Sequence, residues 1–404
     1  MLRPHHEASI LLRIVFLLSL YLALTVVATA GGVLFLRGSG PDDELDALAD
    51  PYSFDFIAWE VRHFPGKLLY DIGHLWDSRR SVPEEEQLLG RYFTLAAEMA
   101  ALESAPQNGG TAAGLALKER ERHGLENDVE DIIERRISDL LGEQGLTFAP
   151  PLFRDFDFVF PPVDFELDRP PKILVISPRQ RIDLTDSFRL DGTLDAAKIV
   201  TLEREAEANG VSALVINVGG VATYPSLVSE LLSYESLVRT AIHEWLHQYL
   251  ALHPLGRNYF ASNELRTLNE TVANLAGNEL LALFFEKYPR SFGLQYPARN
   301  EYVSGEIRNL RLAVESLLVA GQVAEAERLM EEKRLQLQAS GIYIRRLNQA
   351  YFAFYGFYGD TGASISPIGP RLAELRARSG SVTDFVRTAA GIISIEDLDG
   401  LLAN

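Results

Sequence analysis

Histidine and glutamate side chains lie close together in the stretch HEWLH, residues 243–247. Apolar residues recur around this stretch and Pro254 follows it, so the sequence predicts a helix over residues 234–253. Histidines four apart leave one face of a helix a turn apart, and both imidazoles can bind the same ion. Glu244 points about 100° away from His243, where its carboxylate can take a proton from water without binding the ion.

The chemistry that suits these residues is zinc-dependent hydrolysis. Imidazole and carboxylate ligands suit Zn²⁺, which lowers the pKa of bound water to about 7. Glu244 is then the expected general base, which passes the proton on to a leaving amine. The chain contains no cysteine, so thiolate ligands, thiol nucleophiles and disulfides are excluded. We therefore expect one Zn²⁺ ion bound by His and carboxylate side chains alone.

A third protein ligand is expected downstream of the two histidines. His253 has the spacing found in metzincin proteases, but on a continuous helix it points about 240° away from His247. The stretch NELRTLNETVANLAGNELL contains three Asn-Glu pairs, whose acids are Glu264, Glu270 and Glu279. Glu270 is favoured because Asn274 lies one turn later on its face, where it can accept a hydrogen bond from a ligating imidazole.

The stretch HEWLH followed by NETVAN, residues 269–274, resembles the gluzincin metallopeptidases, the thermolysin-like group. The resemblance implies His243, His247 and Glu270 as zinc ligands and Glu244 as the base, with peptides or proteins as substrates. The order of segments, with a membrane anchor first and YIRRLNQAYFAFYGFYGD (343–360) followed by PRLAELRARSGSVTDFV (370–386) near the end, also loosely resembles bacterial membrane-anchored predicted aminopeptidases. This resemblance implies that the enzyme can be an aminopeptidase. The alternative is a noncatalytic membrane-anchored binding protein that keeps a zincin scaffold.

Other parts of a peptidase can be sought around this motif. The stretch ALVINVGGVATYP, residues 213–225, reads as a strand whose edge can hold a substrate backbone, and Gly219 and Gly220 would allow a close approach. An oxyanion stabiliser is also needed, and we expect Tyr355, which shares a helix face with Asn348.

The predicted fold class is α+β and zincin-like, with a small β-sheet followed by a mainly helical half and one N-terminal transmembrane helix. Residues 1–37 would be a membrane anchor or signal segment, 38–149 a helical juxtamembrane region, and 150–404 the zincin-like domain with a helical C-terminal part. Within the second region, a helix over residues 124–145 carries a run of acids that we expect to be a solvated face.

The N-terminal segment predicts the cellular location of the protein, and the overall charge limits its binding partners. Residues 14–36 are an uncharged run long enough to cross a bilayer, with basic residues before it and acidic residues after it. We expect a single-pass membrane protein with an extracytoplasmic body, or a secreted one if the segment is cleaved after Ala30. The formal net charge of −18 argues against a nucleic-acid partner. The polar groups of the 234–253 helix argue against an intramembrane protease.

Overall fold

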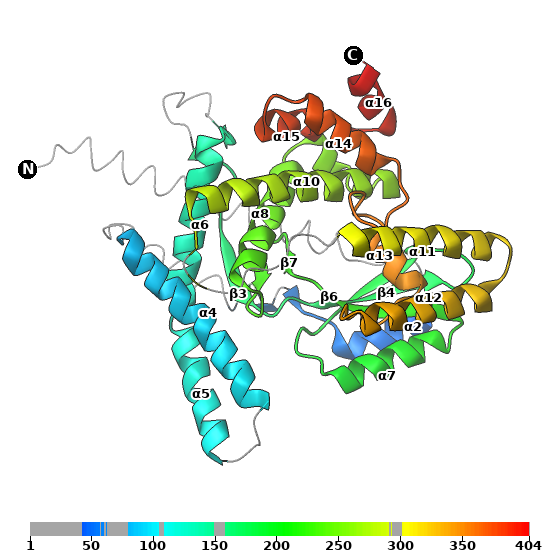
Figure 1. Ribbon diagram of the computed structural model, residues 1–404, viewed down its shortest axis with the longest axis horizontal. Helices are drawn as coiled ribbons and strands as arrows, with labels where there is room; N and C mark the ends of the chain where they lie inside the picture. The colour runs from blue at the N-terminus through cyan, green and yellow to red at the C-terminus, as the bar shows by residue number, and fades with distance from the viewer. Residues whose placement is uncertain are drawn as a thin grey trace, which may run out of the picture.

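The protein is described here from a computed structural model, which defines residues 43–56, 58–59, 62, 80–104, 109–148, 158–290, 292 and 301–403. Helices dominate these residues, and the strands lie between α6 and α8 in the chain (Figure 1). The helices that precede the strands are α2 (Asp43–Ala49), η1 (Asp50–Tyr52), α4 (Val82–Ser104), α5 (Gly109–His123) and α6 (Glu126–Glu143).

Helices α4 and α5 form a hairpin that extends away from the rest of the molecule (Figure 1). Ion pairs join the two helices, among them Lys118 Nζ with Glu98 Oε2 at 2.5 Å and Arg91 Nε with Glu121 Oε1 at 2.7 Å. The composition of residues 104–114 predicts a turn-rich linker, but α5 already begins at Gly109. Its alanines and leucines favour a helix enough to override the glycines at its start.

The strands form small sheets, whose members are β1 (Thr147–Phe148), β2 (Phe158–Val159), β3 (Phe165–Asp168), β4 (Lys172–Pro178), β5 (Asp186–Leu190), β6 (Val211–Asn217), β7 (Gly220–Val221) and β8 (Ser226–Ser229). Their orders are β1-β2, β3-β8-β7 and β5-β4-β6. In the last sheet β4 pairs antiparallel with both neighbours, and Lys172 lies opposite Asn217. One face of this sheet packs on α2 and α7 (Ala196–Glu207), and the other packs on α13.

The second half of the chain is helical, with α8 (Tyr234–Ala251), α9 (Pro254–Arg257), α10 (Asn263–Lys287), α11 (Glu301–Val319), α12 (Val323–Ala339), α13 (Gln349–Tyr355), α14 (Ile368–Arg378), α15 (Val382–Ala390) and α16 (Ile395–Ala403). Helices α8 and α10 pack against each other in the main core, with α14 and α15 on α10. The apolar patterns of residues 305–321 and 323–341 predict a helical hairpin that turns at Gly321, and the structure has it as α11 and α12, with a φ of 73° at Gly321.

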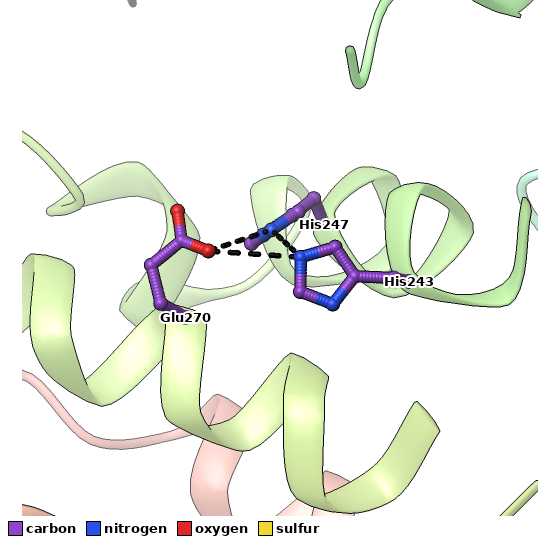
Figure 2. A group of neighbouring side chains, drawn as sticks. All are labelled: His243, His247 and Glu270. Atoms are coloured by element: carbon purple, nitrogen blue, oxygen red, sulfur yellow. Dashed lines mark hydrogen bonds and ion pairs between the residues drawn. The ribbon is translucent and has the colours of Figure 1, made fainter. Parts of the chain in front are cut away.

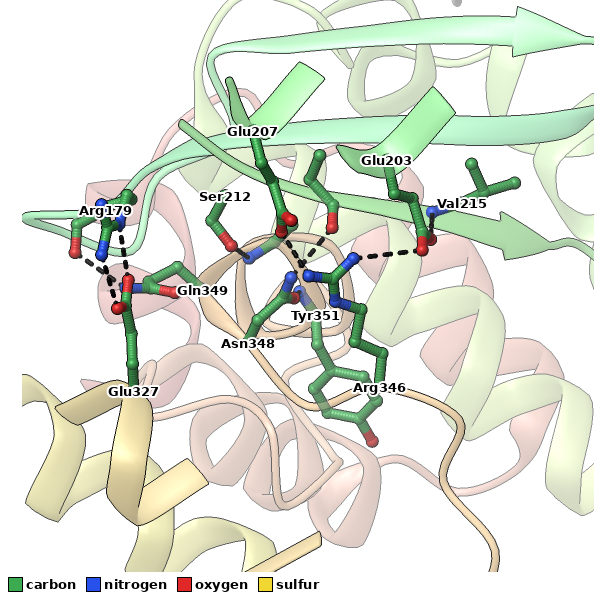
Figure 3. A network of polar contacts seen from close by, with 12 residues as sticks. Arg179, Glu203, Glu207, Ser212, Val215, Glu327, Arg346, Asn348, Gln349 and Tyr351 are labelled. Atoms are coloured by element: carbon green, nitrogen blue, oxygen red, sulfur yellow. Dashed lines mark hydrogen bonds and ion pairs between the residues drawn. The ribbon is translucent and has the colours of Figure 1, made fainter. Parts of the chain in front are cut away.

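A network of polar contacts fixes α13 against the outer edge of β6 (Figure 3). Asn348 caps α13 by accepting from the main-chain N of Tyr351 at 3.0 Å, and its Nδ2 donates to the Ala213 carbonyl at 2.9 Å. The buried carboxylate of Glu203 accepts from the Val215 N at 2.7 Å and pairs with Arg346 at 3.1 Å. Because β6 lies on the edge of its sheet, these side chains satisfy its outward main-chain groups and hold α13 in place.

The sequence predicts a solvated face for the acidic run of α6, but some of its glutamates are not solvated. Glu130 is buried and accepts from the main-chain N of Leu167 at 2.7 Å, while Glu134 accepts from that of Phe165 at 2.8 Å. Both donors belong to β3, which lies at one edge of its sheet. These glutamates therefore cover an edge that would otherwise expose unpaired donors.

The predicted fold class needs correction in two respects. The strands do not form one small sheet but are divided among separate sheets. The predicted transmembrane helix at residues 14–36 lies outside the described residues, and within the described ranges no helix combines the length and the apolar character that a bilayer crossing requires. The structure is thus an α+β arrangement of helices and small sheets.

Candidate metal centre

The centre is built on α8 and α10, two helices whose ends are fixed by local signals. Ser233 caps α8 by accepting from the main-chain N of Ser236 at 3.3 Å, and Pro254 follows the end of the helix. Ser262 caps α10 in the same way, accepting from the N of Leu265 at 3.2 Å. These caps fix the residue at which each helix begins, and so help to determine which residues of α8 and α10 face each other.

Small residues allow α10 to approach α8 closely. Ala273 and Ala276 are fully buried, and a Cβ at Gly277 would lie 3.7 Å from Leu246 Cδ1 of α8. On the other side of α8, Trp245 is buried and its Nε1 donates to the Pro161 carbonyl at 2.8 Å. This packing places the ligand-bearing face of α8 opposite Glu270.

His243, His247 and Glu270 form a group that could hold a metal ion (Figure 2). The Nε2 atoms of the two histidines are 3.0 Å apart. Glu270 Oε2 lies 3.6 Å from His243 Nε2 and 3.4 Å from His247 Nε2. Three ligand atoms from two helices therefore converge on one point.

These separations fit a tetrahedral ion. Zinc–nitrogen and zinc–oxygen bonds of about 2.0–2.2 Å at tetrahedral angles place neighbouring ligand atoms about 3.3–3.5 Å apart. The distances of 3.0, 3.4 and 3.6 Å lie around that value. In addition, Glu270 Oε2 is buried and accepts no hydrogen bond from any residue that the structure describes. A buried carboxylate oxygen without a donor is costly, and a cation at this point would satisfy it.

The electrostatics of the metal-free group follow from the close approach of these charges. Burial by itself lowers the pKa of His247, but the Glu270 carboxylate outweighs it and raises the pKa to about 9. Burial by itself raises the pKa of Glu270, but His247 and His243 lower it well below its usual value. The group therefore keeps Glu270 ionised and favours a positive charge between the side chains.

Hydrogen bonds to the ligands differ from those expected. Asn269 Oδ1 lies 2.7 Å from His247 Nδ1 and accepts its proton, which leaves Nε2 to face the centre. Asn274, which the sequence favoured for this role, donates instead to Asp360 Oδ1 at 3.1 Å. His253 does not join the centre, because its Nδ1 lies 2.8 Å from the Tyr249 carbonyl and its ring stacks on that tyrosine.

Glu244 lies beside the centre without belonging to its ligand set. It is 7 % exposed, lines the same cavity as the three ligands, and forms no hydrogen bond or ion pair with the part of the chain that the structure describes. Burial raises the pKa of its carboxyl group. A Cβ at Gly220 would lie only 2.9 Å from Glu244 Oε1, so the carboxylate rests directly on the main chain of β7.

Tyr355, the expected oxyanion donor, is not the tyrosine that contacts His243, because Tyr358 occupies that position. The Tyr358 ring is 6.4 Å from that of His243, and it lies near enough to Glu270 and Glu244 for their charges, after burial, to raise its pKa further. Tyr355 contacts the ring of Tyr358 at 6.4 Å, and burial alone raises its pKa. Helix α13 ends at Tyr355, and the turn that follows directs Tyr358 towards the histidine.

A cavity of about 590 Å³ opens in front of the centre. Besides the ligands and Glu244, it is lined by the end of β6, by β7, by the residues after α8, and by α13 and its exit. Its walls are largely apolar, and Arg239, Arg257 and Arg266 also reach it. The volume is in the range of cavities that take small molecules or a few residues of a peptide.

Comparison of the chain with known protein families, with curated proteins and with solved structures finds no match. The resemblance to gluzincins therefore stays a prediction from two short motifs. The geometry described above shows that His243, His247 and Glu270 form a group that could hold a metal ion.

Proposed function

We propose that this protein is a zinc-dependent hydrolase of peptide bonds, in which His243, His247 and Glu270 bind one Zn²⁺ ion and Glu244 is the general base. The observation that carries the proposal is the position of Glu244. Its carboxylate has no hydrogen-bond or ion-pair partner in the described chain, and it lines the cavity beside a group that fits a metal ion, so it can take a proton from a water molecule there. A purely structural metal site would need no such residue.

A bound Zn²⁺ ion would act as a Lewis acid towards water and towards a substrate carbonyl. Glu244 accepts the proton of the attacking water and then donates it to the amide nitrogen that leaves. The raised pKa of Glu244 suits both tasks, because a base that is too acidic returns the proton poorly. Gly220 and Thr240 border this carboxylate and limit the directions in which it can turn.

Tyr358 is the residue we propose as the donor to the developing oxyanion, in preference to Tyr355. Burial and the nearby carboxylates keep its pKa well above the usual value, so the phenol stays protonated and can donate. This assignment depends on the proximity of Tyr358 to His243.

The end of β6 supports a peptide as the substrate. The main-chain N and O of Val215 point away from β4, since they bond to Glu203 and Arg345 at 2.7 and 2.9 Å. In an antiparallel pair every second residue points the same way, so Asn217 also directs its main-chain groups away from β4. Asn217 lines the cavity, where an extended peptide can pair with it.

The cavity favours cleavage without a requirement for a free amino terminus. Among the described residues that line it, Glu244 and Glu270 are the only acids, and both have roles in the proposed chemistry. No described carboxylate therefore remains to bind the ammonium group of an aminopeptidase substrate. We propose that peptides with blocked N-termini are cleaved as readily as free ones.

The proposal is tested by assaying a fluorogenic peptide library with the full chain and with Glu244→Gln. The substitution keeps the size of the side chain and removes the base, so we expect hydrolysis to fall about 100- to 10,000-fold while zinc content is unchanged. Glu235→Gln, at the other end of α8, is the matched control and should keep full activity. Equal hydrolysis by wild type and Glu244→Gln would contradict the mechanism, whereas a wild-type chain that binds zinc and hydrolyses no peptide would favour a noncatalytic binding protein.

A further inference from the structure

A buried chain of hydrogen bonds leads from Arg266 through Tyr259 to the third ligand. The Tyr259 hydroxyl donates to Glu270 Oε1 at 2.5 Å, and Arg266 Nε donates to the Tyr259 oxygen at 3.1 Å. Tyr259 is 4 % exposed and Glu270 is 5 % exposed. The oxygen that accepts from Tyr259, Oε1, points away from the two histidines, whereas Oε2 points toward them (Figure 2).

The two oxygens of Glu270 thus have different partners. Oε2 faces both imidazoles and accepts no hydrogen bond from the described residues, whereas Oε1 accepts from Tyr259. We propose that Tyr259 is a positioning residue that holds Glu270 as a ligand through Oε2 alone, and that Arg266 acts by holding Tyr259. The inference rests on the metal-binding part of the proposed function and not on peptidase activity.

The fold fixes each member of this chain. Tyr259 lies in the turn after α9, where its main-chain N donates to the Gly256 carbonyl at 3.1 Å. A Cβ at Gly256 would lie 2.3 Å from the Leu250 carbonyl oxygen, so this glycine lets the turn fold tightly onto the end of α8. The Tyr259 ring then meets the edge of the His247 ring, with their centroids 6.4 Å apart.

Arg266 is held from the opposite direction. It precedes Glu270 by one turn of α10 and lies on the same face of the helix. Its guanidinium carbon lies 4.1 Å from the centroid of the Phe357 ring. Phe357 immediately precedes Tyr358 in the chain. The position of Arg266 is therefore set by α10 and by the segment after α13, and it gives the Tyr259 oxygen a fixed donor.

Occupation of Oε1 has a consequence for the centre. A carboxylate that binds through both oxygens takes two positions around the ion, whereas one that binds through a single oxygen leaves room for water and substrate. A ligand whose second oxygen is hydrogen-bonded is also already oriented before the ion arrives, which favours binding. Tyr259 would supply both effects.

The test measures the affinity of the full chain for Zn²⁺ by competition with a chromophoric chelator. Tyr259→Phe removes only the hydroxyl, and we expect zinc affinity to fall about 10- to 100-fold. Tyr249→Phe is the matched control, because Tyr249 lies on α8 but stacks on Trp245 and His253 away from the centre. It should bind zinc as wild type does. An unchanged zinc affinity in Tyr259→Phe would overturn the inference.

Arg266→Met tests whether the arginine acts through Tyr259, and it also serves if Tyr259→Phe fails to fold. Alone it should weaken zinc binding severalfold, and in the Tyr259→Phe background it should have almost no further effect. The same loss in both backgrounds would show that Arg266 acts independently of the tyrosine. Wild-type protein that binds no zinc would refute the centre and this inference together, whereas zinc binding without hydrolysis would refute only the peptidase proposal.

Discussion

At the scale of single residues, the chemistry proposed for the centre depends on which atom of each side chain already has a hydrogen-bond partner. Asn269 accepts from His247 Nδ1, so the Nε2 atom faces the centre, and Tyr259 occupies one oxygen of Glu270. Glu244 has no such partner among the described residues, which leaves its carboxylate available for proton transfer. The proposed ligands are therefore held in place by hydrogen bonds, whereas the proposed base forms none with the described residues.

The tyrosines near the centre give a prediction at this scale. Tyr358→Phe removes the hydroxyl of the tyrosine whose ring centroid lies 6.4 Å from that of His243, and we expect kcat to fall about 100-fold with a smaller change in KM. Tyr355→Phe is the matched change one turn earlier and should reduce kcat much less. Steady-state kinetics on one peptide substrate measure both effects, and a larger loss in Tyr355→Phe would restore the role that the sequence gave to that residue.

Much of the centre, but not its surroundings, could be predicted from the sequence. The spacing of His243 and His247 fixes their common face on any helix, and the packing of α10 on α8 then brings Glu270 to them. The choice between Asn269 and Asn274 depends on the rotation of α10 about its axis, which the sequence does not give. Tyr259 reaches Glu270 through a turn between two helices, and no periodicity marks such a contact.

At the scale of elements, β7 and α8 together position Glu244, the proposed base. Gly219 O accepts from the Ser229 N at 2.8 Å, which fixes the main chain of β7 to β8. The side chain of Gln248 on α8 donates to Ser226 Oγ of β8 at 2.8 Å. Because the strand and the helix are joined in this way, the main chain at Gly220 cannot easily move away from Glu244.

Gly220→Ala is therefore expected to displace the base without disturbing the ligands. The added Cβ would lie 2.7 Å from Thr240 Cγ2 and 2.9 Å from both Cγ and Oε1 of Glu244, which is closer than a Cβ atom approaches its neighbours in proteins. The flexible end of Glu244 is the part that can shift, so we expect kcat to fall about 10- to 100-fold with zinc content unchanged.

Gly277→Ala is the control for this substitution, since its Cβ would meet α8 at ordinary distances of 3.7 and 4.0 Å. It should leave kcat unchanged and can slightly stabilise α10, because alanine favours a helix more than glycine does. Full activity in Gly220→Ala would show that the base tolerates displacement, contrary to the role given to β7.

The strands show where tertiary structure overrides sequence pattern at this scale. The stretch PKILVIS is found as β4, because its continuous apolar run suits a strand covered on both faces. The acids of α6 read as a solvated face, yet Glu130 and Glu134 bond to β3. A helical charge pattern does not reveal that a sheet edge lies against it.

At the scale of the whole molecule, the centre links metal binding, proton release and stability. In the metal-free protein, Glu270 raises the pKa of His247 from its usual 6.5 to about 9, against the effect of burial. A raised folded-state pKa stabilises the fold below the unfolded-state value, and this contribution is lost as pH rises through about 9. Zinc needs the neutral imidazole, so its affinity should rise over the same interval.

We therefore expect the metal-free protein to unfold at a lower temperature as pH increases from about 6.5 to about 9, and zinc to bind more tightly over that range. Thermal unfolding of the metal-free chain measures the first effect, and calorimetry in buffers of different ionisation enthalpy measures proton release on zinc binding. Glu270→Gln should remove this part of the pH dependence. A metal-free stability that increases with pH over this interval would contradict the assigned charge state.

Whether α8 and α10 together bind one metal ion is decided by the zinc stoichiometry of the full chain, determined by elemental analysis of wild type, Glu270→Ala, Glu264→Ala and His253→Ala. The claim that ligands from α8 and α10 form one centre predicts about one Zn²⁺ per chain in wild type, Glu264→Ala and His253→Ala, and almost none in Glu270→Ala. Zinc retained by Glu270→Ala and lost from His253→Ala would assign the third ligand to the turn after α8 and contradict the account.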